Sequence, residues 1–389
     1  MTQAQERVAR PRSRRLFVVV LLAALVLLFG VPWWLLVLGP QWPVAVFVVG
    51  TVLFAGAAVG FPWLMFLGHS RRAQDWAARI GDTTLGVVWV LFAWTLLGTV
   101  PRVVLGLAGV DNPLRSRLVA GLVVAVTLVL VLWGYVEAMR IPRVKRVDVV
   151  LPRLSPGMAG LRVVLLADTH FGPIDRARWS ARTAAAVNAL EPDVVCHAGD
   201  IADGTVERRQ AQAAPLGDIR ARLARVYVTG NHEYFGEAQA WLDHLTELGW
   251  ESLHNRHVVV ERGGARLVLA GIDDATARAS GLPGHGANLT AALAGADPNL
   301  PVLLLAHQPR QVVVAEAAGI DLQVSGHTHG GQIWPFHYLV RVDQPTVHGL
   351  TRHGDRTQLY TTRGAGFWGP PLRVFAPSEI TLLTLRTAG

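Results

Sequence analysis

Residues 162–170 read Arg-Val-Val-Leu-Leu-Ala-Asp-Thr-His, an apolar run that ends in two polar side chains, Asp168 and His170. A short, continuous apolar run of this kind is typical of a buried strand in an α/β sheet. Residues that follow such a strand lie at the carboxyl edge of the sheet, where α/β proteins collect ligands. The stretch therefore predicts a strand over Val163–Ala167 with Asp168 and His170 at its functional end.

Four further apolar runs end in the same way. They are Val194–Ala198, Val226–Thr229, Val302–Ala306 and Asp321–Ser325. The polar residues that follow them are Asp200, Asp203, Asn231, His232, His307, His327 and His329. Five strand ends thus bring three aspartates, one asparagine and five histidines toward one place. So many oxygen and imidazole groups without thiolates suit a pair of divalent transition metals.

The 389-residue chain has two regions of different composition. Hydrophobic residues make up 51% of it, more than soluble proteins usually contain, and the excess lies before residue 140. Four apolar stretches reach or approach the roughly 20 residues that cross a bilayer. They are Leu16–Leu38, Trp42–Leu67, Leu85–Val100 and Leu118–Val136. The third is the shortest and stops at Pro101 and Arg102, but it extends through Val103–Val110 if Arg102 is accommodated. We therefore predict a transmembrane helical region over residues 1–145 and an α/β domain over residues 146–389.

Positive charge indicates the side of the membrane on which the α/β domain lies. Basic residues precede the first span, follow the second and follow the fourth: Arg7, Arg10, Arg12, Arg14, Arg15, Arg71, Arg72, Arg79, Arg140, Arg143, Lys145 and Arg146. Because cytoplasmic loops are enriched in Lys and Arg, four spans place the domain in the cytoplasm. Arg115 and Arg117 fall on the outer side in this arrangement, and three spans would place the domain outside.

Composition also bears on the organism and on the class of partner. Arginine is abundant while Lys145 is the sole lysine, which indicates a high-GC bacterial genome and hence a bacterial cell membrane. The net charge of +8 comes largely from arginines that flank apolar segments. The α/β segment has no extended basic and aromatic strip of the kind that single-strand binders use, so no nucleic acid is expected. The single cysteine, Cys196, lies in a predicted strand and is expected to be buried and unreactive.

The ordered motifs resemble those of the calcineurin-like metallophosphoesterases. The longer strings GNHEYFGE, GIDD, AHQP, GHTHGGQ and TTRGAGFWGPPLR resemble the bacterial membrane-attached subgroup, and the match runs from about residue 160 to 385. The resemblance implies a four-layer α/β/β/α sandwich with a dinuclear metal site at one edge of the sheets. It implies that one metal is held by Asp168, His170 and His329, the other by Asn231, His307 and His327, with Asp200 as the bridge. It also implies that His232 stands beside the leaving-group oxygen.

These residue types suit the hydrolysis of phosphate esters. Two divalent ions about 3.5–4 Å apart can acidify a bridging water and clamp phosphate oxygens, and Mn, Fe or Zn are the expected metals. A carboxylate bridge sets their spacing, while neutral imidazoles and an asparagine leave positive charge that attracts an anion. His232 offers a proton near neutral pH to the departing alkoxide.

Four more residues could support this site, each with an ordinary alternative. Asp203 orients a ligand or caps a helix. Asp273 and Asp274 end another predicted strand and either face the site or serve only the fold. Arg363 lies in a glycine-rich loop and either meets a phosphate or is a plain surface arginine. Histidines outside the motifs, among them His254 and His285, are expected to be ordinary.

Membrane attachment, and the resemblance to relatives that cleave lipid-linked nucleotide pyrophosphates, favour an amphiphilic phosphoester near the bilayer as substrate. A soluble phosphodiester such as a cyclic nucleotide, and a phosphoprotein, stay open as alternatives. A non-catalytic scaffold would have lost ligands, whereas here all the expected ligands are present. A transport role for the spans is poorly supported, because they contain no ionisable residue apart from Glu137 at the very end.

Overall fold

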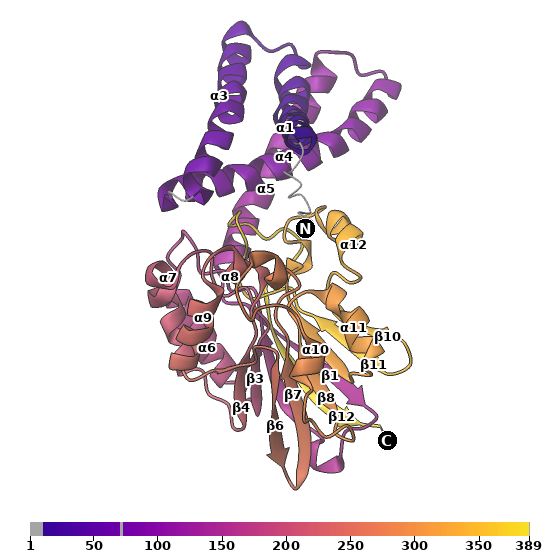
Figure 1. The fold of residues 1–389 in the computed structure, drawn as a ribbon. Coiled ribbons are helices and arrows are strands. Elements are labelled where there is room, and N and C mark those ends of the chain that lie inside the picture. Colours follow the sequence, from indigo (N-terminus) through magenta and orange to yellow (C-terminus); the bar gives the residue numbers. More distant parts are fainter. Residues whose placement is uncertain (1–10, 71–72, 389) are drawn as a thin grey trace, which may run out of the picture. The chain divides into compact units, whose positions relative to one another are not determined.

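The computed structural model describes residues 11–70 and 73–388, which divide between Leu132 and Trp133 into two compact units. Part of the basis for the predicted orientation lies outside the described residues, namely Arg7, Arg10, Arg71 and Arg72 and the side chains of Arg12, Arg14 and Arg15. The two units differ in secondary structure, since the first is helical and the second is built around sheets (Figure 1).

The N-terminal unit consists of apolar helices. They are α1 (Pro11–Leu25), α2 (Val31–Trp33), α3 (Val44–His69), α4 (Asp75–Leu107) and α5 (Leu114–Met139), with π-helical turns at Val26–Gly30 and Trp34–Leu38. Four segments are long and apolar enough to cross a membrane, namely Val18–Leu38, Val44–His69, Asp75–Leu107 and Leu114–Met139. The prediction of four apolar helices is therefore confirmed.

The third of these helices begins much earlier than the sequence predicted. Charged residues delimited the predicted span, but α4 includes Asp82, which is buried and lies 2.8 Å from Nε2 of His69. It also continues through Pro101 and Arg102 to Leu107, which agrees with the longer alternative for this span. A proline in an apolar helix is tolerated where neighbouring groups satisfy the freed carbonyl, so Pro101 does not end the helix.

The C-terminal unit contains two six-stranded sheets. The order in the first is β1 (Arg143–Leu151), β12 (Glu379–Thr387), β2 (Arg162–Leu166), β3 (Val194–His197), β4 (Ala224–Tyr227) and β5 (Glu251–Ser252). The order in the second is β10 (Gly349–His353), β11 (Thr357–Thr361), β9 (Leu322–Ser325), β8 (Val302–Leu305), β7 (Ala265–Gly271) and β6 (Arg256–Arg262). The five predicted strands are present, each shifted by no more than two residues at an end. They pair in parallel with their neighbours among β2, β3 and β4 and among β7, β8 and β9.

Alternate residues of the strands build two different cores, because successive side chains of a strand point to opposite faces. Val163 and Leu165 of β2 pack with Leu303 and Leu305 of β8, so the two sheets face each other. Cys196 lies in this inner core, and burial raises the pKa of its thiol, in line with the unreactive cysteine that was predicted.

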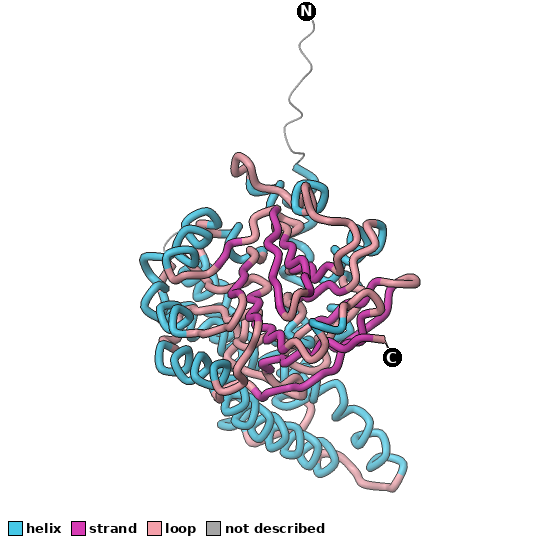
Figure 2. The backbone as a smooth tube through the Cα atoms, turned by 90° about the horizontal axis from the view of Figure 1, so that it is seen from below, coloured by secondary structure: helices cyan, strands magenta, loops and turns pink. Residues whose placement is uncertain are grey.

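The outer faces of both sheets are covered by helices. The helices of this unit are α6 (Ala177–Asn188), α7 (Val206–Ala213), α8 (Asn231–Phe235), α9 (Ala238–Glu247), α10 (Leu289–Ala292), α11 (Val312–Ala317) and α12 (His337–Asp343). Val164 of β2 packs with Trp179 of α6 and Trp241 of α9, while Leu304 of β8 packs with Ala315 of α11. The strands gather in the middle of the unit in both views (Figure 1, Figure 2). The predicted four-layer α/β/β/α sandwich is therefore confirmed.

Candidate metal centre

The turns after the strands hold their residues in an uncommon backbone conformation. Positive φ angles occur at Asp168 (55°), His170 (42°), Asp200 (55°), His327 (71°) and His329 (51°). A left-handed backbone costs a residue with a side chain on the order of 1–2 kcal/mol, so such residues cluster where function needs them. Backbone bonds hold the first two turns together: the amides of Asp168 and His170 donate to the carbonyls of Gly199 and Asp200, at 2.9 and 3.2 Å.

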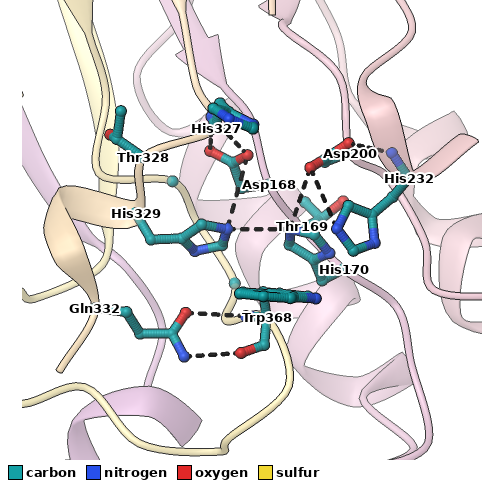
Figure 3. Close-up of polar contacts among 12 residues, drawn as sticks. Asp168, Thr169, His170, Asp200, His232, His327, Thr328, His329, Gln332 and Trp368 are labelled. Carbon is teal, nitrogen blue, oxygen red and sulfur yellow. Dashed lines mark hydrogen bonds and ion pairs between the residues drawn. The ribbon is translucent and has the colours of Figure 1, made fainter. Parts of the chain in front are cut away.

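One group of predicted ligands forms around His170 (Figure 3). Its Nε2 atom lies 3.1 Å from Nε2 of His329 and 3.6 Å from Oδ2 of Asp200. Nε2 of His329 in turn lies 3.8 Å from Oδ1 of Asp168. The carboxylate of Asp168 is oriented by the backbone amide of His327, which donates to both of its oxygens at 2.9 and 3.1 Å. These side chains are buried and offer nitrogen and oxygen lone pairs to one point.

A second group forms around His307. Its Nε2 atom lies 3.2 Å from Oδ2 of Asp200 and 3.1 Å from Oδ1 of Asn231. The same Asn231 oxygen lies 2.9 Å from Nδ1 of His327. Asp200 therefore belongs to both groups, and its carboxylate stands between His170 and His307.

The hydrogen bonds of the second group indicate that it binds a cation. Nδ1 of His307 lies 2.7 Å from the carbonyl oxygen of Ala198 and must donate to it, which leaves the lone pair of the neutral ring on Nε2. Nε2 then faces oxygens of Asp200 and Asn231 that are also acceptors. A positive species must sit among three acceptors, either a proton or a metal ion. Burial lowers the pKa of His307, but the carboxylate of Asp200 outweighs burial and raises it to about 10.

Burial controls the charge of His327 and His329. It lowers the pKa of His327 to about 3 and that of His329 well below the ordinary value. Both rings are therefore neutral near pH 7, which is the form that binds metals. Burial also opposes the charge of Asp200, but the neighbouring His307 and His232 outweigh it and hold the pKa of Asp200 well below its usual range.

Asp203 connects His170 to His232. Its Oδ1 atom lies 2.9 Å from Nδ1 of His170 and 2.7 Å from Nδ1 of His232. The alternative that Asp203 caps a helix is not what the structure shows, because α7 begins after Thr205 and has no side-chain cap. Burial lowers the pKa of His232, but Asp200 and Asp203 outweigh it and raise the pKa to about 9.

Glu233 is a structural residue whose role was not predicted from the sequence. It is fully buried, and its carboxylate accepts bonds from the backbone amides of Gly230 (2.6 Å), Asp200 (3.0 Å) and Ile201 (2.8 Å). It thereby ties the turn that carries Asn231 to the turn that carries Asp200. A glutamate three residues after the residue that precedes a helix is a recognised capping pattern, and that signal was present in the sequence.

Three other candidates lie apart from the two groups. Gln308 donates to both oxygens of Asp274 at 2.9 Å. Asp273 pairs with His254 at 2.6 Å, and the side chain of Arg363 bonds to His348 at 3.2 Å. Within residues 11–70 and 73–388, no hydrogen bond or ion pair joins the side chains of Asp273, Asp274 or Arg363 to a predicted metal ligand. The structure thus places these three beside the centre rather than in it.

Two histidines that were expected to have no special role form a cluster with Asp273. His254 and His285 gather around Asp273, and their rings lie 4.5 Å apart. Nδ1 of His285 bonds to the hydroxyl of Tyr234 at 3.0 Å. The carboxylate of Asp273 also accepts bonds from Asn255 (3.1 Å) and from the amide of Gly286 (2.8 Å). The cluster fastens the loop that follows β5 to the end of β7.

Two residues of the glycine-rich loop after β11 also reach the centre. Arg373 is fully buried, and its guanidinium lies 3.3 Å from Nδ1 of His329 while it donates to the carbonyls of Gly366 and Ala376. The ring of Trp368 lies 5.9 Å from that of His232 (Figure 3). Both residues lie in the string TTRGAGFWGPPLR, but the string by itself indicates no partner for either side chain, so their contacts with His232 and His329 were not predicted.

The chain is similar in sequence to a known protein family and to proteins of several organisms. A family model described as calcineurin-like phosphoesterase matches residues 161–331. The chain is 36% identical to a Danio rerio protein named transmembrane protein with metallophosphoesterase domain, over 80% of this chain and 74% of that protein. It is 34% identical to an uncharacterized metallophosphoesterase of Campylobacter jejuni, over 86% of this chain and 87% of that protein. Among solved structures, a 5'-nucleotidase precursor from Thermus thermophilus aligns with 15% identity and a TM-score of 0.38, covering 58% of this chain and 54% of that chain.

Proposed function

The chain belongs to the calcineurin-like metallophosphoesterases, and we propose that it is a membrane-anchored hydrolase that cleaves phosphate esters with two divalent metal ions. The single observation that carries the proposal is the position of Asp200. One of its oxygens lies 3.6 Å from Nε2 of His170 and 3.2 Å from Nε2 of His307, so one carboxylate serves both groups of ligands. We assign Asp168, His170 and His329 to one ion, Asn231, His307 and His327 to the other, and Asp200 to both.

The bound ions, for which we propose Mn, Fe or Zn, would supply an activated water and neutralise phosphate oxygens. The chain's own residues do the rest. Asp203 accepts from Nδ1 of His170, which leaves the Nε2 lone pair directed at the metal site and fixes the ring. Asp203 likewise holds Nδ1 of His232, so the second proton of that ring sits on Nε2. His232 donates this proton to the departing oxygen as general acid.

We propose that residues 1–145 anchor the domain of residues 146–389 in a bacterial cell membrane, with the domain in the cytoplasm. The support is the set of four helices that are long and apolar enough to span, together with basic residues that follow α5, such as Arg140 and Arg143. The substrate class that we propose is an amphiphilic phosphoester, because an anchored enzyme meets such molecules at high local concentration.

The test uses the full chain, purified in detergent, stripped of metal and supplied with Mn²⁺, Fe²⁺ or Zn²⁺. Hydrolysis of bis-p-nitrophenyl phosphate or p-nitrophenyl phosphate should depend on the added metal. Asp200→Asn should lose this activity and at least one bound ion by metal analysis.

Asp148→Asn is the matched control, because Asp148 is an exposed aspartate on β1 that pairs with Arg386. It should retain both activity and ions. Full occupancy by two ions in Asp200→Asn would overturn the bridging role, and hydrolysis that is independent of metal would overturn the proposed function.

A further inference from the structure

The end of helix α5 is bound directly to the glycine-rich loop of the metal centre. The backbone amide of Arg373 donates to the carbonyl of Gly134 at 2.9 Å, and the ring of Phe375 lies 5.5 Å from that of Trp133. The approach is close, since a Cβ atom at Gly134 would meet Cγ2 of Val374 at 3.0 Å. Gly134 lies in the apolar segment Leu114–Met139, about 7.5 Å before its end at the rise of an α-helix. If α5 spans a bilayer, this loop therefore lies at the depth of its surface.

The same end of the C-terminal unit exposes large apolar side chains. Phe375 in the loop is 56% exposed, Val342 of α12 is 85% exposed and Phe235 of α8 is 72% exposed. Helices α8 and α12 lie at one end of this unit (Figure 1). α12 is attached to the loop, because Ile333 bridges to Val374 and Phe375 a few residues before the helix begins. Several large apolar side chains exposed at one end of a domain are typical of a surface that meets a protein or membrane partner.

Phe375 is also strained. Its φ angle is 60°, in the left-handed region, where a bulky residue is an outlier. The strain holds an aromatic ring at the surface beside Trp133 rather than in the core. A solvated surface gains nothing from that arrangement, whereas an aromatic ring at the headgroup level of a bilayer is stabilised.

The apolar surface reaches the proposed proton donor. The ring of Phe235 lies 5.1 Å from that of His232, and the ring of Trp368 lies 5.9 Å from it. Gln332 fixes this part of the loop, because its amide oxygen accepts from the amide of Trp368 at 3.0 Å and its amide group donates to the carbonyl of Trp368 at 2.8 Å (Figure 3). Two exposed aromatic side chains therefore flank the proposed proton donor, and a third, Phe375, lies beside the end of α5.

We propose that an interfacial surface of this unit contacts the bilayer in which α5 is anchored. The interfacial surface consists of Phe235, Trp368, Phe375 and the exposed residues Leu339 and Val342 of α12. The substrate is a membrane lipid phosphoester whose apolar portion lies along this surface. Exposed basic residues directly after α5, Arg140 and Arg143, suit anionic headgroups at the same level. The part that concerns the substrate rests on the proposed phosphoesterase function. The part that concerns the bilayer contact does not.

The bilayer contact is tested with a fluorophore on an introduced cysteine, because the native Cys196 is fully buried and will not react. The full chain carrying Val342→Cys is labelled and placed in nanodiscs of phosphatidylcholine and phosphatidylglycerol with nitroxide-labelled lipid. The matched control is Val150→Cys, an exposed valine of β1 that lies seven residues, or about 23 Å, along the strand from Arg143. Lipid nitroxides should quench the label at residue 342 several-fold more than the label at residue 150. Equal quenching would overturn the contact.

The substrate class is tested with two diesters that differ only in chain length, hexadecyl p-nitrophenyl phosphate in vesicles and ethyl p-nitrophenyl phosphate in solution. The variant is Leu339→Ser with Val342→Ser, which changes α12 and leaves the metal ligands in place. It should lower kcat/KM for the hexadecyl ester by about tenfold or more, as expected for the loss of two apolar contacts, and leave the ethyl ester unchanged. If wild type and variant hydrolyse both esters with equal efficiency, the lipid assignment fails while the phosphoesterase stands. If neither ester is hydrolysed with any metal, the proposed function itself fails.

Discussion

The Nδ1 atom of His232 lies 2.7 Å from Oδ1 of Asp203, the same oxygen that stands 2.9 Å from Nδ1 of His170. One carboxylate thus orients a predicted metal ligand and the proposed general acid, whose rings meet edge to face at 4.6 Å. In the proposed site, Asp203 therefore supports both metal binding by His170 and proton donation by His232, although Asp203 itself contacts neither phosphate nor metal.

Replacement of that carboxylate should weaken both functions at once. Asp203→Asn removes the negative charge that helps to hold the pKa of His232 near 9, so that pKa should fall. Loss of a partner that orients a metal-bound histidine typically costs about 10- to 100-fold in metal affinity or activity. Metal titration and turnover of bis-p-nitrophenyl phosphate should both show the loss, with Asp148→Asn as control. Unchanged metal affinity would mean that His170 needs no such support.

Loss of the proposed acid should separate catalysis from metal binding. His232→Ala should keep both metals and lose roughly 10²- to 10⁴-fold in turnover, the usual range for general acid catalysis. The loss should be largest for alkyl leaving groups, which need protonation, and smaller for p-nitrophenolate, which departs as a stable anion. Equal slowing of both substrates with metals retained would instead indicate that His232 contacts the phosphate. Loss of the metals would make it a ligand or the support of one.

Replacement of Glu233 should lower the thermal stability of the protein. Its carboxylate accepts amide bonds from Gly230, Asp200 and Ile201, and Glu233→Gln turns one acceptor oxygen into a donor that faces backbone N–H groups. A buried donor without an acceptor costs about 1–3 kcal/mol. Thermal unfolding of the full chain in detergent should therefore occur at a lower temperature. Glu261→Gln, an exposed glutamate of β6, should unfold like the wild type.

Interaction between His254 and Asp273 should stabilise the fold within a defined pH range. The hydrogen bond that the His254 ring donates to the Asp273 carboxylate raises the pKa of His254. The contribution of His254 to stability is therefore complete below the unfolded value of 6.5 and is lost as the pH rises through the higher folded value. Burial opposes ionisation of Asp273, but its bonds from His254 and Gly286 lower its pKa, so its contribution is complete above 3.8 and is lost as the pH falls through the lower folded value.

The two contributions overlap between the unfolded values of 3.8 and 6.5. His254→Gln should lower the Tm more at pH 5.5 than at pH 9. His353→Gln, on β10, is the matched control and should show no such dependence. A difference in Tm that grows with pH would contradict the pairing.

The membrane topology can be tested with the variant Val150→Cys. Under the proposed orientation, Val150→Cys faces the cytoplasm, so in intact cells it should resist a membrane-impermeant thiol reagent and react after lysis. Because Cys196 is buried, the signal comes from the introduced residue. Ready labelling of intact cells would place the domain outside and indicate an odd number of spans.

The parts of the fold that could be predicted are those with a local signature. Val163–Ala167 and Val302–Ala306 are continuous apolar runs because parallel strands buried between layers need apolar residues on both faces. The third apolar helix begins earlier than predicted, since a charge such as Asp82 ends an apolar stretch in the sequence even where His69 pairs with it in the structure. Only those residues of the candidate site that directly follow a strand could be predicted from the sequence.

The sequence by itself determined the order of elements, the apolar helices and the residues presented at the strand ends, because hydrophobic periodicity and the direction of a parallel strand are local properties. Only the tertiary structure decided that Asp203 serves two histidines, that Glu233 ties two turns together and that Arg373 joins His329 to the end of α5. Those contacts join residues about 30 to 240 positions apart in the chain. No local pattern encodes such a pairing, since it depends on how the layers pack and on where each buried polar group must find a partner.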